Sequence, residues 1–219
     1  MKRLKLGVLI SGRGSNLQAL IDAADDPTYP AEIGLVISNR PEAAGLERAA
    51  RAGIAHQALA HPSREAFAAA ADEALCRQGV GLVVLAGYMR ILDTGFVEAW
   101  HDRLVNIHPS LLPAFPGLHP QRQALAAGVR FSGCTVHFVR AAVDTGPIIG
   151  QAVVPVRDDD DEERLAARIL EAEHRLYPLT VRWFAEGRLR IVGNRVAIAG
   201  GRPPERALFN PEALASRGG

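Results

Sequence analysis

The 219-residue sequence is poor in cysteine and aromatic residues and carries almost no net charge. Its two cysteines, Cys76 and Cys134, lie far apart and form no metal-ligand spacing, so the sequence offers neither a disulfide framework nor a metal cluster. Its 25 basic and 24 acidic residues nearly balance, which excludes the basic field typical of nucleic-acid binders. We therefore expect a cytoplasmic protein with reduced thiols that binds no nucleic acid and no metal.

Long apolar runs are also absent. The longest, residues 80–89, is about half of the roughly 20 residues that a membrane-spanning helix needs. The first three residues lead directly into a strand pattern, so we expect no signal peptide and no membrane association. No internal repeat and no interior linker is visible. We expect one domain over residues 1–200 and a loose tail over residues 201–219.

Short apolar runs alternate with helical patterns along most of the chain. Strands are expected at residues 4–10, 32–38, 54–59, 80–86, 104–108, 131–140 and 148–156. Helices are expected after Asn16 and at residues 41–52, 63–78, 121–127 and 162–184. Strands joined by helices form parallel sheets with right-handed crossovers. The sequence thus predicts an α/β fold, a mostly parallel twisted sheet with helices on both faces, followed by a small hairpin over residues 189–198.

One candidate site lies in the segment Asn106-Ile107-His108-Pro109-Ser110-Leu111-Leu112-Pro113. Asn106 and His108 are two apart on a strand, so their side chains leave the same face. Pro109 ends that strand and leaves the pair at its carboxyl end, where open α/β sheets bind ligands. An amide and an imidazole can both donate to an oxygen that gains negative charge. The alternative is a strand whose polar residues face water.

A second candidate site is the glycine turn Ser11-Gly12-Arg13-Gly14-Ser15-Asn16, which stands between a strand and a helix. Glycines allow close backbone approach to a ligand, and the unpaired N–H groups of a helix start bind phosphate. Leu17 occupies the third glycine position of a dinucleotide fingerprint, which favours a single phosphate monoester. The alternative is a plain turn capped by Ser15 or Asn16.

Two further loops complete the pattern. Gly87-Tyr88-Met89-Arg90-Ile91-Leu92 offers an apolar wall and one cation, which suits an aromatic ligand with an acidic tail. A loop that packs on the core is the alternative there. Asp144 stands in a Gly/Pro turn, where Asp is usually a turn former. Its functional interpretation is as a partner that orients and charges His108.

With these motifs, and with Thr135-Val136-His137-Phe138, Asp144-Thr145-Gly146-Pro147 and Glu173-His174, the sequence resembles the phosphoribosylglycinamide formyltransferases, a family of the folate-dependent formyltransferase superfamily. The similarity runs from about Leu4 to Leu189. It implies a Rossmann-like single-domain fold and transfer of a formyl group from 10-formyltetrahydrofolate to the primary amine of glycinamide ribonucleotide in purine biosynthesis. The small-molecule partners implied are this nucleotide and the formylfolate, bound by a monomer or homodimer.

The resemblance also implies roles for individual residues. The catalytic set is Asn106, His108 and Asp144. The phosphate of the nucleotide is bound by Gly14, Ser15 and Asn16, and the rest of it by Leu170, Glu171, Ala172 and Glu173. The folate-binding positions are Arg64, Met89, Arg90, Ile91, Leu92, Asn106, Arg140, Ala141, Ala142, Val143 and Asp144.

Two departures from the family pattern and three rival functions accompany this resemblance. Arg13 stands where a small amide is common, and Pro120-Gln121 follows His119 where a second histidine can occur. The rivals are a methionyl-tRNA formyltransferase, a formyltetrahydrofolate hydrolase and a non-catalytic nucleotide- or folate-binding protein. The first two normally carry an additional domain, and we expect none here. The third is disfavoured by the intact Asn106, His108 and Asp144.

Overall fold

The computed structural model describes residues 2–211. Its strands are β1 (Leu4–Ile10), β2 (Ala31–Ser38), β3 (His56–Ala58), β4 (Leu82–Leu85), β5 (Leu104–His108), β6 (Phe131–Phe138), β7 (Ile148–Pro155), β8 (Leu189–Val192) and β9 (Arg195–Ile198). Its helices are α1 (Ser15–Ala24), α2 (Ala44–Arg51), α3 (Arg64–Arg77), α4 (Thr94–Ala99), α5 (Pro120–Ala126) and α6 (Glu162–Ala185). Every strand and helix expected from the sequence is present, within a few residues.

All nine described strands form one sheet in the order β3-β2-β1-β4-β5-β6-β7-β9-β8. The strands from β3 to β5 run parallel, whereas β6 is antiparallel to β5 and β7 is antiparallel to β6. The expected mostly parallel α/β sheet is therefore confirmed. The strand order reverses between β1 and β4, the kind of switch point at which open α/β sheets bind ligands.

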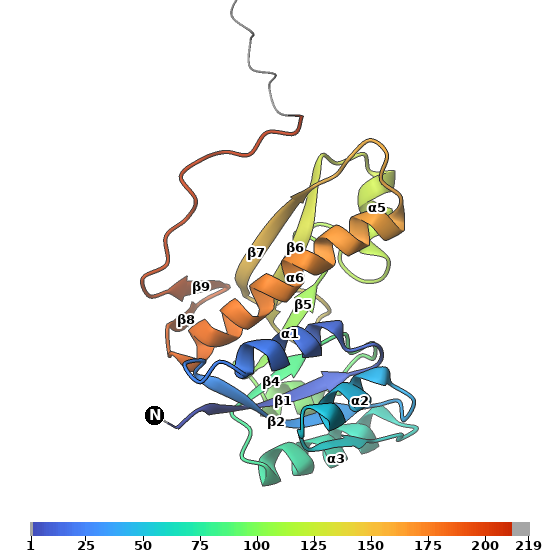
Figure 1. Cartoon of the computed structure of the whole chain (residues 1–219), viewed down its shortest axis with the longest axis vertical. Coiled ribbons are helices and arrows are strands. Elements are labelled where there is room, and N and C mark those ends of the chain that lie inside the picture. The colour runs from blue at the N-terminus through green and yellow to red at the C-terminus, as the bar shows by residue number, and fades with distance from the viewer. Residues whose placement is uncertain (1, 212–219) are drawn as a thin grey trace, which may run out of the picture.

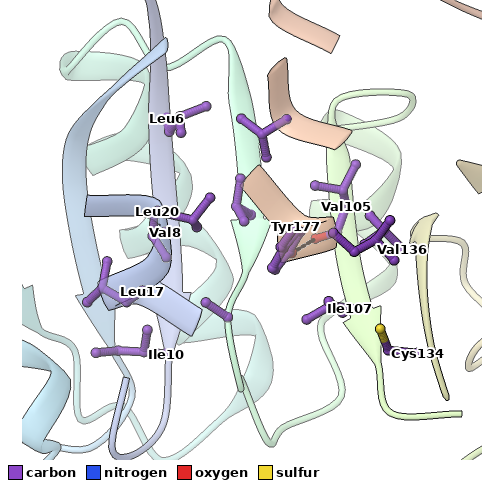
Figure 2. Packing of buried hydrophobic residues seen from close by; sticks show 14 of the residues in the cluster. Leu6, Val8, Ile10, Leu17, Leu20, Val105, Ile107, Cys134, Val136 and Tyr177 are labelled. Atoms are coloured by element: carbon purple, nitrogen blue, oxygen red, sulfur yellow. Dashed lines mark hydrogen bonds between the residues drawn. The ribbon is translucent and has the colours of Figure 1, made fainter. Parts of the chain in front are cut away.

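Helices cover both faces of the sheet, and the alternation of strand side chains divides the core between them. Leu6 and Val8 of β1 pack with Leu17 and Leu20 of α1 and with α6, whereas Leu9 packs with α3 and α4 on the other face. Figure 1 shows α1 and α6 side by side over the sheet, and Figure 2 shows Leu17 and Leu20 of α1 beside Val8 and Ile10 of β1.

Two details differ from the sequence prediction. Helix α4 was not expected, because six residues give too short a pattern to recognise; Asp93 caps it by accepting hydrogen bonds from the backbone N–H groups of Gly95 and Phe96. Helix α2 begins at Ala44 and not at residue 41, since Arg40 to Ala43 forms a turn.

The hairpin near the end of the domain is confirmed as β8 and β9, and β9 also extends the sheet by pairing with β7. Beyond it, residues 201–211 contain no helix or strand, and the Asn210 amide donates to the carbonyl of Val156 at 3.0 Å. Residues 212–219 of the expected tail lie outside the described part of the chain. No helix within residues 2–211 has the length and apolarity to span a bilayer.

Tyr177 of α6 ties this helix to the centre of the sheet. Its ring is fully buried, and its hydroxyl lies 2.8 Å from the carbonyl oxygen of Leu85 and 3.2 Å from that of Val105. Leu85 ends β4, and Val105 precedes Asn106 on β5. The hydroxyl therefore joins the two strands just where the candidate site begins.

Replacing this residue, Tyr177→Phe, is predicted to lower the free energy of unfolding by about 1–2 kcal/mol, because the ring stays packed while its buried hydrogen bond is lost. The change is measured by chemical denaturation. Tyr29→Phe removes another buried hydroxyl, which donates to the carbonyl of Pro178 in α6 and to no strand, and is the matched control. Full stability of the Tyr177 variant would show that the hydroxyl does not link the strands.

Candidate active site

The candidate site lies where the sheet changes from parallel to antiparallel pairing. Asn106 and His108 stand on β5, and β6 places His137 directly opposite Asn106. The Asn106 side-chain nitrogen lies 3.3 Å from His137 Nε2. The cross-strand register thus adds a second imidazole to the pair expected from the sequence.

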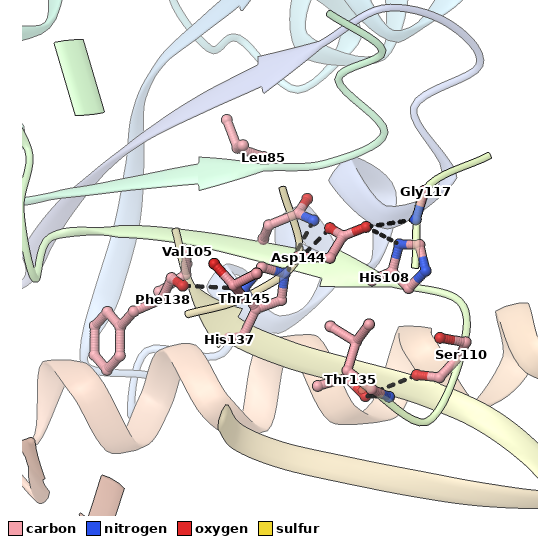
Figure 3. Close-up of polar contacts among 12 residues, drawn as sticks. Leu85, Val105, His108, Ser110, Gly117, Thr135, His137, Phe138, Asp144 and Thr145 are labelled. Atoms are coloured by element: carbon pink, nitrogen blue, oxygen red, sulfur yellow. Dashed lines mark hydrogen bonds and ion pairs between the residues drawn. The ribbon is translucent and has the colours of Figure 1, made fainter. Parts of the chain in front are cut away.

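Asp144 joins this group from the turn between β6 and β7. One of its carboxylate oxygens, Oδ2, lies 3.4 Å from His108 Nδ1, and the other, Oδ1, lies 3.7 Å from His137 Nε2. The backbone N–H of Gly117 donates to Oδ2 at 2.8 Å. Figure 3 shows the carboxylate between the two imidazoles, with Gly117 on the His108 side. The three catalytic candidates expected from the sequence therefore lie together.

The ring of His108 meets an oxygen at each nitrogen. Nδ1 faces Asp144, and Nε2 lies 3.0 Å from the carbonyl oxygen of Phe115. Phe115 belongs to the loop between β5 and α5, residues 109–119, which we call the covering loop. A neutral imidazole has one N–H and can satisfy one of these acceptors, whereas the protonated ring can donate to both. Its side chain is only 8% exposed, so water screens the charge of Asp144 weakly. Both ring nitrogens of His108 thus lie next to an oxygen acceptor in a nearly buried setting.

His137 has the opposite character. Burial lowers its pKa, an effect that outweighs the hydrogen bond to Phe138 and the charge of Asp144, both of which raise it. Its Nδ1 lies 3.0 Å from the carbonyl oxygen of Phe138, so Nδ1 carries the hydrogen and Nε2 is left to accept from the Asn106 amide. We infer that neutral His137 orients Asn106 and leaves the second amide hydrogen of Asn106 available.

A tight backbone approach holds Asp144 in place. Asp144 itself has a positive φ of 54°, which is uncommon for a residue with a side chain. A Cβ added at Gly146 would lie 1.7 Å from the carbonyl oxygen of Phe138, so only glycine fits there. A register shift between Val136 and His137 accompanies this turn, as is common beside active sites.

Most of the expected folate-binding positions line one cavity beside Asp144. Its lining residues are Leu85, Tyr88, Arg90, Ile91, Leu92, Val97, Asn106, His137, Val139, Arg140, Ala141, Val143 and Asp144. The exposed side chains of Met89, Ile91 and Val143 offer apolar surface on its two bordering loops. Three expected positions, Arg64, Met89 and Ala142, are not part of this lining. Arg64 is the first residue of α3. Arg90 does line the cavity, and its guanidinium donates a hydrogen bond to the carbonyl of His61.

A second cavity, of about 610 Å³, lies over the start of α1. It is lined by Ser11, Gly12, Arg13, Gly14, Ser15, Asn16, Arg40, Ala86, Gly87, Met89, Pro109, Gln121, Glu163, Ala166, Ala167, Ile169, Leu170 and Glu173. Gly14 is the N-cap of α1 with φ 70°, and no side chain caps the helix. Capping by Ser15 or Asn16 is therefore wrong, and the first N–H groups of α1 are available to a ligand.

The four expected positions on α6 point in different directions. Leu170 and Glu173 line the second cavity, Ala172 packs against the core, and Glu171 faces a surface hollow beside Arg168. The structure thus brings two of the four to the cavity.

Sequence reasoning gave no role to several residues that the structure places at the site. His137 stands in a predicted strand and in a motif of the family resemblance but was given no role, because its position opposite Asn106 requires the antiparallel register of β6. Arg40 follows β2, the neighbour of β1, so its closeness to the glycine turn follows from the strand order. Ser11 is the first residue of that turn, and its hydroxyl accepts a hydrogen bond from the N–H of Met89 at 2.8 Å.

The family model described as formyl transferase matches residues 4–181. The chain belongs to the formyl transferase family. It is 47% identical over 212 residues to the phosphoribosylglycinamide formyltransferase of Escherichia coli (strain K12). This match covers 95% of this chain and 100% of the relative. The solved structure of glycinamide ribonucleotide transformylase 1 from Symbiobacterium toebii has a TM-score of 0.87 at 55% identity and covers 90% of this chain and 94% of its own.

A longer relative is the trifunctional purine biosynthetic protein adenosine-3 of Drosophila pseudoobscura pseudoobscura, which is 54% identical over 195 residues. The match covers 87% of this chain but only 14% of the length of that protein. The present formyl transferase chain thus corresponds to one part of the trifunctional protein.

The Gly146 contact predicts how this formyl transferase responds to one added methyl group. Gly146→Ala should reduce formyl transfer at least about 100-fold, because even an approximately 1 Å displacement of a catalytic group has that cost. Steady-state kinetics measure the loss. Gly34→Ala is the matched control, since its Cβ would meet nothing closer than 3.6 Å. Unchanged kinetics in the Gly146 variant would show that the turn does not hold Asp144.

Proposed function

We propose that this formyl transferase moves the formyl group of 10-formyltetrahydrofolate to the primary amine of glycinamide ribonucleotide. The observation that carries the proposal is the cluster of Asn106, His108 and Asp144 between two neighbouring cavities. Asn106 and Asp144 line one cavity, and Pro109, next to His108, lines the other. A group can pass from a ligand in the first cavity to a ligand in the second across this cluster.

The chemistry starts with attack by the nucleotide amine on the formyl carbon. A carbon–nitrogen bond forms while the carbonyl oxygen becomes an anion, and collapse of this tetrahedral centre breaks the bond to the folate nitrogen. Asn106 and protonated His108 donate hydrogen bonds to the anionic oxygen, each donor contributing on the order of 3 kcal/mol. In this step His108 Nε2 exchanges the Phe115 carbonyl for the substrate oxygen, which requires a small movement of the covering loop.

Asp144 stabilises the imidazolium of His108 and keeps the ring oriented. A proton must leave the attacking amine and reach the departing folate nitrogen, either through His108 or through a water molecule held by Asp144. A covalent acyl intermediate is disfavoured, because burial raises the pKa of the Cys134 thiol to about 12 and leaves it protonated.

The two cavities suit the two substrates. The first combines the side chains of Leu85, Ile91 and Leu92 with the cations Arg90 and Arg140, which fits an aromatic heterocycle that carries a carboxylate tail. The second joins the open start of α1 to Arg13 and Arg40, which fits a phosphate group. The departure noted at Arg13 therefore adds a cation at the cavity wall.

The remaining expectations belong to the same proposal. Formyltetrahydrofolate acts as a cosubstrate and no metal takes part, the protein works in the cytoplasm, and it acts as a monomer or homodimer. We also propose that residues 1–200 form the catalytic domain and that residues 201–219 are a tail.

The discriminating assay mixes the protein with 10-formyltetrahydrofolate and follows deformylation with and without glycinamide ribonucleotide. The proposed transfer requires the nucleotide, and formylated nucleotide should appear in equal amount. Deformylation without nucleotide would select the formyltetrahydrofolate hydrolase alternative. Binding of both ligands without deformylation would select a non-catalytic binding protein.

The catalytic set predicts a split between turnover and binding. His108→Ala and Asp144→Asn should each lower kcat by about 100-fold or more, because each weakens stabilisation of charge that exists only in the transition state. The Kd for a folate analogue, measured by fluorescence titration, should change far less. A variant that keeps the turnover of the unmodified protein would remove that residue from the catalytic set.

The phosphate site predicts an effect on one substrate only. Ser15→Asp should raise the KM for glycinamide ribonucleotide by about tenfold or more and spare the KM for the formylfolate, because the new carboxylate repels phosphate. Ser15→Ala is the control for lost hydroxyl contacts without added charge. Equal increases in both KM values would argue against phosphate binding at this helix start.

A further inference from the structure

The segment of residues 87–92, which we call the shared wall, borders both cavities of the site. Gly87 and Met89 line the second cavity, over the start of α1. Tyr88 and residues 90–92 line the first cavity, beside Asp144. Neighbouring residues of one short segment thus face two different ligands. A displacement of the shared wall therefore changes both cavities and the distance between the ligands that they hold.

Ser11, the first residue of the glycine turn, is hydrogen-bonded to the shared wall at two points. Its backbone N–H donates to the carbonyl of Gly87 at 3.2 Å, and its hydroxyl oxygen accepts from the N–H of Met89 at 2.8 Å. The same hydroxyl donates to Oδ1 of Asn39 at 2.6 Å. Asn39 follows β2 and precedes Arg40, which lines the second cavity. One hydroxyl group therefore joins the ends of β1 and β2 to the shared wall.

Ser11 and Tyr88 hold the shared wall from different sides. The ring of Tyr88 stacks on that of Phe67, with 5.5 Å between the ring centroids. The side chain of Met89, by contrast, is 72% exposed and adds little packing of its own. Ser11 is only 3% exposed, so water cannot easily replace the hydrogen bonds of its hydroxyl. On the side of the second cavity, the position of the wall thus depends on Ser11.

We propose that Ser11 is a positioning residue that sets the separation of the two substrates. It acts through Gly87 and Met89, by holding the shared wall where both cavities keep their shape. A single ligand can bind while the wall shifts to meet it. Transfer, in contrast, needs the two reacting atoms about 3–3.5 Å apart at the same moment. The inference rests on the proposed function in taking the two ligands to react with each other.

A linked compound measures this separation, because both of its ends must fit at once. In the compound, the amine of glycinamide ribonucleotide is joined to a folate-like ring by a short uncharged spacer, and the two halves are also measured alone. Ser11→Ala should raise the Kd of the linked compound by about tenfold or more and that of each half by no more than about twofold. An unchanged Kd of the linked compound would overturn the proposal. Equal weakening of one half would also overturn it, because Ser11 would then be a ligand of that half.

Steady-state kinetics should show the same separation of effects. In Ser11→Ala, kcat should fall by about tenfold or more, while the KM of each substrate stays within about twofold. Asn39→Ala keeps Ser11 but removes the acceptor of its hydroxyl, so kcat should fall in the same direction. Thr180→Val removes another buried hydroxyl, which donates to the carbonyl of Tyr177 within α6, and is the matched control. A kcat that is unchanged in both the Ser11 and the Asn39 variant would contradict the inference.

Amide hydrogen exchange tests the anchor without any ligand. The N–H of Met89 should exchange at least about tenfold faster in Ser11→Ala, because its acceptor is gone, and at the unmodified rate in Thr180→Val. Unchanged exchange at Met89 in Ser11→Ala would show that Ser11 does not hold the wall. Failure of the proposed function has a different signature: the linked compound would bind the unmodified protein no better than its halves, while Met89 exchange would still respond to Ser11→Ala.

Discussion

The contact between the carboxylate of Asp144 and the imidazole of His108 is the interaction on which the rest of this site depends. The two side chains are 3.4 Å apart and nearly buried, so water screens the interaction between them weakly. In the proposed mechanism this carboxylate stabilises the imidazolium that donates to the anionic oxygen of the tetrahedral centre. Without this pair, Asn106 would be left as a single neutral hydrogen-bond donor to the substrate oxygen.

The fold serves this pair by changing strand direction at β5. Parallel strands from β3 to β5 bring the glycine turn, the 87–92 loop and Asn106 to one edge of the sheet. The antiparallel strands β6 and β7 then return the chain to the same edge, and their connecting turn presents Asp144 beside His108. The close packing of Gly146 on Phe138 and the N–H of Gly117 hold that turn and the covering loop against each other.

Local patterns in the sequence were sufficient to predict the α/β class, nearly every helix and strand, and the clustering of Asn106 with His108. These features depend on the spacing of apolar residues along each helix or strand and on residues that are close in the chain. The arrangement of His137 opposite Asn106 depends on pairing between strands far apart in sequence, which no local pattern specifies. The same is true of Asn16, which the family resemblance assigned to the phosphate, while the hydrogen-bond partner of its side chain lies 157 residues away on α6. A partnership of Asp144 with His108 was one of two interpretations of its turn, and no local pattern could show that the two side chains meet.

The roles of Asn106, His108 and Asp144 are tested most directly by a crystal structure with a stable analogue of the tetrahedral centre. In this analogue a sugar phosphate and a folate-like ring are joined through a carbon that bears a hydroxyl. We expect this hydroxyl oxygen about 3 Å from Asn106 Nδ2 and from a nitrogen of His108, with Asp144 still against the opposite nitrogen of that ring. An analogue bound with its hydroxyl directed away from both donors, or with Asp144 separated from His108, would contradict it.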